Sequence, residues 1–263
     1  MSGMSDFGVP AAQAYSLRAE EYAELLGSMD ATAEPDRALI GRWADTVRHE
    51  LVSGRAPVQG RDGEGSARQD AGDPGRPSQA QASDEEAGPR LLLDVGCGPG
   101  HWTAWLDARL RGPASGVRDE AVRSGRAAVR VEGIDPSPAF VDLARGRFPG
   151  TAFRLGRAED LGVPEASVHG ILAWYSLIHT PPEAVPAALA EFARALAPGG
   201  SLLVGFFEGP RREPFDHAVT QAWYWPVPEL AVLMEAVGFV VEETHTRQDP
   251  GVRAHGAILA RPR

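Results

Sequence analysis

A glycine-rich turn between an apolar run and an amphipathic helical pattern constrains the fold of this chain most. Residues 91–95 form a short apolar run without alternation, which is typical of a strand buried on both faces of a parallel sheet. The turn Gly96-Cys97-Gly98-Pro99-Gly100 follows, and residues 101–110 then place Trp and Leu at helical spacing. Glycines let the chain turn sharply and let a ligand lie against the backbone, while helix N–H groups face an anionic group. The sequence therefore predicts a strand, turn and helix unit with a ligand site at the turn.

The same alternation of strand and helix patterns continues to the end of the chain. Further strands are expected at a segment ending in Asp135 and at residues 152–155, 170–174, 201–207, 239–246 and 254–260. Helices are expected at residues 14–28, 36–52, 140–148, 185–196 and 228–237. Asp36 is expected to cap the second of these helices, and Pro198-Gly199-Gly200 to stop the one before residue 201. Repeated units of this kind predict right-handed crossovers and a doubly wound α/β sheet.

Composition divides the chain into three parts. Residues 1–52 form an N-terminal helical lead-in, and residues 91–263 carry the strand and helix pattern. Between them, residues 53–90 are rich in Gly, Pro, Ser, Gln, Ala and charge, with Val58 as the one large aliphatic residue. Such a segment cannot bury enough apolar surface to offset its ordering entropy, so we expect a disordered linker or insertion. A shorter biased stretch, residues 112–127, is expected to be an expanded surface loop.

Charge and cysteine content exclude several classes of protein. A formal charge of −10 over 263 residues would repel a phosphate backbone, so no nucleic-acid partner is expected. The single cysteine, Cys97, cannot form an internal disulfide, and no metal-ligand spacing is present, so we expect no metal and a reducing cytoplasm. The longest apolar stretches are too short to span a bilayer, so neither export nor a membrane anchor is expected.

Two acidic residues accompany the glycine turn. Asp94 ends the first strand, where it could hold a ligand ammonium group or order the loop. Asp135 ends the second strand, and its two oxygens suit the vicinal hydroxyls of a ribose. Asp135 lies 35 residues after Gly100, more than the about 20 of a typical nucleoside-binding unit, and the 112–127 stretch accounts for the excess. His101 stands where a dinucleotide fold would have its third glycine, which argues against a pyrophosphate at this turn.

The motifs together resemble the class I S-adenosylmethionine-dependent methyltransferases. The resemblance covers residues 91–207, and residues 14–28 match the usual lead-in of that family. It depends on four motifs in the expected order: Leu91-Leu-Leu-Asp-Val-Gly-Cys-Gly-Pro-Gly100, Gly133-Ile-Asp-Pro-Ser-Pro138, Ala158-Glu159-Asp160-Leu161 and Leu196-Ala-Pro-Gly-Gly200. It implies a Rossmann-like, mostly parallel sheet of seven strands with helices on both faces and an antiparallel last strand.

The resemblance also implies roles for individual residues. Asp94, Gly96 and Gly98 would line the methionine part of S-adenosylmethionine, with Cys97 as a small filler, and Gly100 would also belong to the donor site. Asp135 would hold the ribose, and Pro136 would flank the adenine. Ala158 and Glu159 would meet the adenine edge, Trp174 would lie beside the sulfonium, and Tyr22 would close the pocket. Arg157 stands where many relatives carry Asp, which puts the contact to the adenine amino group in doubt.

Methyl transfer to a hydroxyl or a protonated amine needs a base near the methyl group. His179 follows the fourth predicted strand at the edge where open α/β sheets place ligands, so it is a candidate base, although a packing role is equally compatible with the sequence.

Trp223-Tyr224-Trp225 either walls a substrate pocket or packs in the core. The sequence thus predicts an S-adenosylmethionine-dependent methyltransferase acting on an O, N or C atom of a small molecule. The alternatives are an NAD-dependent oxidoreductase and a non-catalytic nucleoside-binding module.

Overall fold

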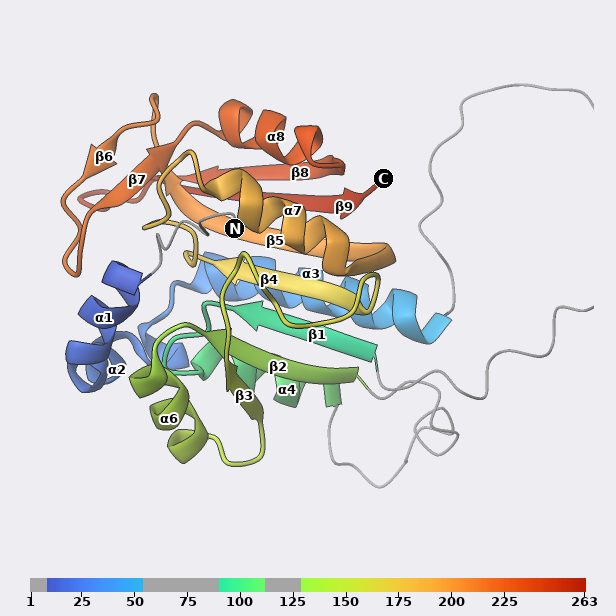
Figure 1. Ribbon diagram of the computed structural model, residues 1–263, viewed down its shortest axis with the longest axis horizontal. Helices are drawn as coiled ribbons and strands as arrows, with labels where there is room; N and C mark the ends of the chain where they lie inside the picture. Colours follow the sequence, from blue (N-terminus) through green and yellow to red (C-terminus); the bar gives the residue numbers. More distant parts are fainter. Residues whose placement is uncertain (1–8, 54–89, 112–128) are drawn as a thin grey trace, which may run out of the picture.

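A central sheet organises the described part of the chain. A computed structural model describes residues 9–53, 90–111 and 129–263. Its strands are β1 (Arg90–Val95), β2 (Val129–Asp135), β3 (Ala152–Leu155), β4 (Val168–Trp174), β5 (Leu196–Glu208), β6 (Pro214–Phe215), β7 (Ala222–Trp225), β8 (Phe239–Arg247) and β9 (His255–Pro262). Strands β3, β2, β1, β4 and β5 lie side by side in this order and run parallel (Figure 1). The order reverses at β1, which is the switch point of a doubly wound sheet.

The far edge of the sheet confirms the predicted antiparallel last strand. Strand β9 pairs antiparallel with β5, and β8 pairs antiparallel with β9. The described residues contain nine strands rather than the seven predicted. The two additional strands, β6 and β7, are short and pair with each other, and β7 also adds to the end of β5. They have only two and four residues, so they are too short to give a strand pattern that could be distinguished from a loop.

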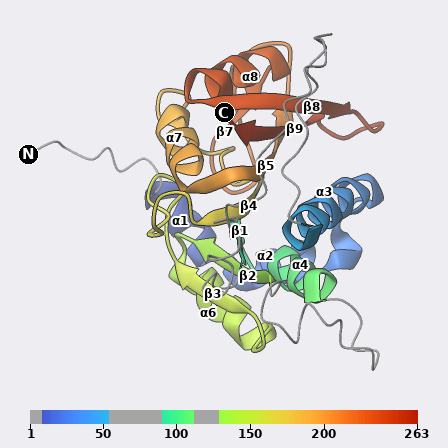
Figure 2. The same ribbon diagram turned by 90° about the vertical axis from the view of Figure 1, so that its right-hand side faces the viewer.

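Helices cover both faces of the sheet, as predicted. The described helices are α1 (Val9–Leu17), α2 (Ala19–Leu26), α3 (Glu34–Ser53), α4 (His101–Arg111), α6 (Pro138–Arg147), α7 (Val185–Ala195) and α8 (Val227–Ala236), with a 3-10 turn η1 (Met29–Ala31). The edge-on view in Figure 2 shows α3 and α4 on the opposite side of the sheet from α7 and α8. None of the helices in the described ranges combines the length and apolar character needed to cross a bilayer.

Three local predictions are corrected by the structure. The single helix expected at residues 14–28 is broken at Arg18, whose backbone leaves the helical region, so α1 and α2 form separate helices. Asp36 lies inside the first turn of α3 and not at its N-cap, because the helix already begins at Glu34. Helix α7 ends at Ala195, since Leu196 is already extended, and Pro198-Gly199-Gly200 lies within β5.

Two predictions fall outside the described residues. The expected disordered segment at 53–90 lies outside them except for Ser53 and Arg90, which end α3 and begin β1. The expanded loop expected at 112–127 also lies outside them. The division into parts at residues 52 and 91 therefore stays a prediction.

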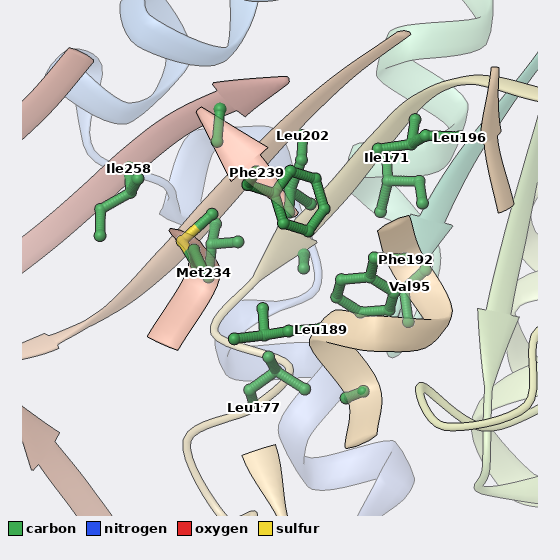
Figure 3. Packing of buried hydrophobic residues seen from close by; sticks show 14 of the residues in the cluster. Val95, Ile171, Leu177, Leu189, Phe192, Leu196, Leu202, Met234, Phe239 and Ile258 are labelled. Atoms are coloured by element: carbon green, nitrogen blue, oxygen red, sulfur yellow. The ribbon is translucent and has the colours of Figure 1, made fainter. Parts of the chain in front are cut away.

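A continuous apolar core fixes the strands that carry the site. On one face, Leu189 and Phe192 of α7 and Met234 of α8 pack over Ile171 and Leu202 of the sheet (Figure 3). All five side chains are fully buried, and truncating a buried Leu or Phe to Ala typically costs about 2–5 kcal/mol. On the other face, α3 and α4 bury a second cluster against β1, β5 and β9. The ends of β1, β2 and β4 are therefore held in place from both sides.

Candidate active site

A cavity of about 600 Å³ opens at the carboxyl ends of the parallel strands. Its floor is the glycine turn after β1 together with the ends of β2 and β4, and its cover includes Tyr15 of α1 and Tyr22 of α2. In Figure 1 these two helices lie beside the sheet at the end where β1, β2 and β4 point. Ligands of open α/β sheets bind at this edge, next to the switch point. The cavity is therefore the candidate active site.

The glycine turn has a backbone shape that only glycine adopts without strain. Gly96 and Gly98 have φ angles of +72° and +52°, in the left-handed region that costs other residues about 1–2 kcal/mol. A Cβ on Gly96 would lie 2.3 Å from the Cβ of Ser176, so the loop after β4 packs directly on this turn. A Cβ on Gly98 would meet no atom within 4 Å, because this residue borders the cavity. Gly98 thus keeps open a space that a ligand can occupy.

The amide groups of the turn are engaged within the protein. Gly96 N and Cys97 N donate to the carbonyl of Ile134 at 2.7 and 3.0 Å, and Gly100 N donates to Cys97 O at 3.1 Å. Gly98 N donates to Oδ2 of Asp135 at 2.8 Å. Pro99 has no N–H. None of the amides from 96 to 100 is therefore left for a phosphate, which agrees with the sequence argument from His101 against a pyrophosphate at this turn.

Two carboxylates lie beside the turn instead. Asp94 is 2% exposed and accepts a hydrogen bond from Thr103 Oγ1 at 2.6 Å. Asp135 is 6% exposed and accepts from Gly98 N and from Ser137 N, each at 2.8 Å. Burial raises the pKa of Asp94 to about 7 and that of Asp135 to about 6, against the stabilising hydrogen bonds. This pair of buried acids favours a ligand with positive charge and hydroxyl donors.

The other residues predicted to bind the donor divide into two groups. Cys97, Pro136, Ala158, Glu159 and Trp174 all border the cavity, together with Asp94, Gly96, Gly98 and Asp135. Gly100 does not border it. A Cβ there would lie 2.8 Å from Ala144 and Phe153, so Gly100 allows close packing of the turn on α6 and β3. Burial raises the pKa of the Cys97 thiol, which keeps it protonated and unsuited to act as a nucleophile.

Arg157, the departure from the family pattern, borders the cavity next to Glu159. Its Nε donates to Glu159 Oε1 at 2.7 Å. The positive charge at this position is therefore balanced by the carboxylate predicted to meet the adenine edge. A ligand that contacts the carboxylate of Glu159 therefore has to share it with Arg157.

Another part of the cavity wall carries His179 and an aromatic cluster. His179 Nε2 hydrogen-bonds Tyr15 Oη at 2.8 Å, and its Nδ1 donates to Gln221 O at 2.8 Å. Tyr22 contacts the ring of Tyr15 edge-on at 5.4 Å, and both rings contact Phe140 of α6. Tyr22 and His179 thus border the cavity, where the sequence expected them.

Sequence reasoning missed several side chains on this same side. Tyr175, Phe207, His217 and His255 border the cavity and contact one another through their rings. Arg247 of β8 also borders it and forms an ion pair with Asp36 of α3 at 3.0 Å. One signal was available, because Tyr175 directly follows β4, although its φ of +56° is visible only in the structure. The remaining side chains come from β5, β8 and β9 and the connections between them.

The sequence left two roles open for Trp223-Tyr224-Trp225, a pocket wall or core packing, and the structure supports core packing. Trp225 is 2% exposed within the main core cluster, and Trp223 packs against that cluster. Tyr224 stacks on Phe215 with ring centroids 4.2 Å apart. None of the three residues borders the cavity. Among the described residues, moreover, no cluster of three or more His, Cys, Asp and Glu side chains is arranged to hold a metal ion.

Comparisons with known proteins agree with this geometry. Residues 92–200 match the family described as Methyltransferase domain. The chain is 36% identical over 116 residues to a trans-aconitate 2-methyltransferase of Methylobacterium radiotolerans, covering 44% of this chain and 37% of that protein. It is 31% identical over 176 residues to a probable S-adenosylmethionine-dependent methyltransferase of Mycolicibacterium smegmatis, covering 65% and 58%. The match to the first of these relatives thus spans less than two fifths of that protein's length.

Solved structures share the fold over nearly the whole chain. One is a magnesium protoporphyrin IX methyltransferase of Synechocystis with bound SAM, at a TM-score of 0.57 and 15% identity over 99% of both chains. Another is a 1,6-didemethyltoxoflavin-N1-methyltransferase of Burkholderia thailandensis, at a TM-score of 0.53 and 20% identity over 100% of this chain and 92% of that one. The strand order and these solved structures show a Rossmann-like fold. The family match over residues 92–200 and the two named relatives support a class I S-adenosylmethionine-dependent methyltransferase.

Proposed function

We propose that this protein transfers a methyl group from S-adenosylmethionine to a small molecule. The observation that carries the proposal is the turn after β1, whose amides are all engaged internally while two buried carboxylates lie beside it. A pyrophosphate needs free amides and the absence of nearby negative charge. S-adenosylmethionine carries an ammonium group, a sulfonium and a ribose diol, which suit these acids. The same observation opposes the dinucleotide alternative.

The residues around the cavity fit S-adenosylmethionine for two reasons. The space beside the Cα atom of Gly98 is free of protein atoms. In addition, Ser176 Oγ is buried with no hydrogen-bond partner among the described residues, so it can bond a ligand. Asp94 would hold the ammonium group, and Asp135 the ribose hydroxyls. Pro136 would flank the adenine, whose edge Ala158 and Glu159 would meet. Trp174 would lie beside the sulfonium, where an aromatic face stabilises positive charge. When bound, S-adenosylmethionine supplies an electrophilic methyl group.

The chain's own contribution to the reaction is to bind, orient and exclude water. Methyl transfer is an in-line displacement, for which correct placement of the two reactants alone can lower the barrier by about 7–11 kcal/mol. Tyr15 and Tyr22 cover the cavity from the N-terminal helices, which supports a role for residues 1–52 in closing the site. Covering the site removes water that would otherwise weaken its electrostatic interactions.

A small-molecule acceptor is supported by the size of the cavity and by the charge of the chain. About 600 Å³ lies within the 300–1,000 Å³ typical of small-molecule sites. The formal charge of −10 opposes binding to a nucleic-acid backbone. The names of two similar proteins, a trans-aconitate methyltransferase and a 1,6-didemethyltoxoflavin methyltransferase, also give small molecules as acceptors.

Ligand-dependent melting tests the proposed donor against the alternatives. S-adenosylhomocysteine should raise the melting temperature, and NAD should not, because a ligand that binds only the folded state stabilises it. A larger shift with NAD would contradict the proposal. A panel of acceptors incubated with S-adenosylmethionine and read by mass spectrometry should then give a product with one added methyl group. Binding of S-adenosylhomocysteine without product from any acceptor would favour a non-catalytic binding module.

A further inference from the structure

A chain of hydrogen bonds lies in the part of the cavity wall formed by α1 and the loop after β4. It runs from Tyr15 of α1 to His179 in the loop after β4, and on to Gln221, which directly precedes β7. The carbonyl oxygen of Gln221 can only accept, so Nδ1 of His179 carries the proton. In the neutral ring Nε2 then holds a lone pair, and the hydroxyl of Tyr15 donates to it. Both Tyr15 and His179 border the cavity.

The surroundings of this chain of hydrogen bonds keep the side chains of Tyr15 and His179 uncharged. Burial lowers the pKa of His179 against the hydrogen bond to Gln221, and burial raises that of Tyr15, with smaller effects from Tyr22 and Asp135. The ring of His217 faces His179 with centroids 5.1 Å apart, and burial lowers its pKa to about 4. His179 is therefore a neutral imidazole at pH 7, able to accept a proton.

The rest of the wall on this side carries a second hydrogen-bonded pair and a cation. Tyr175 Oη and His255 Nδ1 hydrogen-bond each other, and the ring of Tyr175 lies 5.0 Å from that of Phe207. Burial lowers the pKa of His255, so this imidazole is neutral as well. Arg247 faces two carboxylates, Asp36 at 3.0 Å and Asp249 at 3.5 Å, and its Nη1 is buried with no hydrogen-bond partner among the described residues.

Building on the proposed function, we infer that the acceptor bears a hydroxyl group, and that Tyr15 and His179 together take up its proton. The acceptor oxygen forms the new C–O bond as the C–S bond of the donor breaks, leaving its electron pair on sulfur. The acceptor proton passes to Tyr15 Oη while the proton of Tyr15 passes to Nε2 of His179. The products are a methyl ether, a neutral thioether and an imidazolium, which returns its proton to solvent after product release.

The binding arm of the test uses S-adenosylhomocysteine and two ring compounds, one with and one without a hydroxyl proton. The full-length protein, labelled with ¹⁵N-histidine and saturated with S-adenosylhomocysteine, is titrated with phenol and with anisole. Phenol should shift the His179 nitrogen resonances saturably, and anisole, which has no hydroxyl proton to donate, should bind at least about tenfold more weakly. The inference on the acceptor is overturned if anisole binds as tightly as phenol, or if phenol leaves His179 unchanged.

The hydrogen-bonded pair is tested in the same spectra. Tyr15→Phe should move the Nε2 resonance of His179 toward that of an unbonded nitrogen. Tyr22→Phe, which removes a hydroxyl from a neighbouring half-buried ring, should not move it. An unchanged Nε2 resonance in Tyr15→Phe would overturn the pairing. If the wild type does not bind S-adenosylhomocysteine, that result counts against the proposed donor and not against the pairing.

The kinetic arm separates proton transfer from packing. With a hydroxyl acceptor that the mass-spectrometric panel identifies, His179→Gln should lower kcat with little change in the acceptor KM, because glutamine accepts the bond from Tyr15 but takes up no proton. It should also abolish the rise of kcat with pH that reports on the imidazole. An unchanged pH profile, or methylation confined to amine or carboxylate acceptors, would overturn the role of the pair.

Discussion

Replacing Asp94 by Asn should stabilise the ligand-free protein at high pH while weakening donor binding. The carboxyl group of Asp94 is buried, and its pKa is raised from the ordinary 3.8 to about 7. The native state therefore holds this proton more tightly than the unfolded state does. Asp94 consequently costs stability as the pH rises from 3.8 to about 7, and the cost stays constant above that range. Asparagine at this position still accepts the hydrogen bond from Thr103 Oγ1 and carries no charge.

The size of the effect follows from the pKa. Each unit of pKa difference between native and unfolded states corresponds to about 1.36 kcal/mol, so the full cost is about 4 kcal/mol. The free energy of unfolding of Asp94→Asn should exceed that of the wild type by about 2 kcal/mol at pH 5 and by about 4 kcal/mol at pH 9. Urea titrations of both proteins across this range measure the difference. A gap that does not change with pH would refute the reasoning.

A matched control comes from Asp107, another buried acid. Its carboxylate forms an ion pair with Arg111 at 2.7 Å and accepts a hydrogen bond from Thr151 Oγ1 at 3.1 Å. Asp107→Asn should therefore lower stability at neutral pH, opposite to Asp94→Asn. Removing a buried carboxylate is thus expected to raise the free energy of unfolding only where the carboxylate has no positively charged partner.

The same reasoning predicts proton release on donor binding. An ammonium group placed against Asp94 lowers its pKa again, so S-adenosylhomocysteine should bind the wild type more tightly as the pH rises toward about 7. Calorimetry in buffers of different ionisation enthalpy measures the protons released. Asp94→Asn should release fewer protons on binding and should bind S-adenosylhomocysteine more weakly. If it releases as many protons as the wild type, the ammonium group does not lie against Asp94.

Further substitutions probe the remaining parts of the site and the core. Asp135→Ala should weaken S-adenosylhomocysteine binding by about 10–100-fold, since charge-assisted hydrogen bonds contribute about 1.5–3 kcal/mol, and undiminished binding by calorimetry would exclude the ribose contact. Gly98→Ala should cost about 1–2 kcal/mol of stability from its φ of +52° and lower affinity further, because the new Cβ enters the cavity. Gly100→Ala should chiefly lower the melting temperature, because its Cβ would lie 2.8 Å from Ala144 and Phe153. Trp43→Phe should cost about 1–3 kcal/mol in urea titrations, because it leaves Ser201 Oγ without the 2.9 Å hydrogen bond from Nε1.

The donor half of the site is predictable from the sequence because its parts are local. Gly96, Gly98 and Asp94 lie within one strand and turn unit, and Asp135 ends the neighbouring strand in the parallel pairing. In a parallel sheet the carboxyl ends of adjacent strands meet at one edge. The sequence pattern therefore places these residues together before any coordinates are known. One predicted residue, Gly100, does not border the cavity, and it lies close against Ala144 and Phe153.

Details at the ends of elements depended on contacts that local patterns do not contain. Asp36 looks like a helix cap in sequence, yet it lies within α3 and pairs with Arg247 of β8. The strands β6 and β7 form because β7 adds to the extended end of β5, not because of their own sequence pattern. A pattern of few residues carries too little information to distinguish such a strand from a loop.

The sequence by itself determined the fold class, the glycine turn and the two acids beside it, because these follow from periodicity and from chain order in parallel units. Only the tertiary structure decided how the acceptor side is built. Tyr15 and His179 are 164 residues apart, and His179 and Gln221 are 42 apart, yet hydrogen bonds link them directly. Their pairing depends on how α1, the loop after β4 and the segment before β7 pack together. The sequence named His179 as a candidate base, and the structure shows that its Nε2 hydrogen-bonds Tyr15.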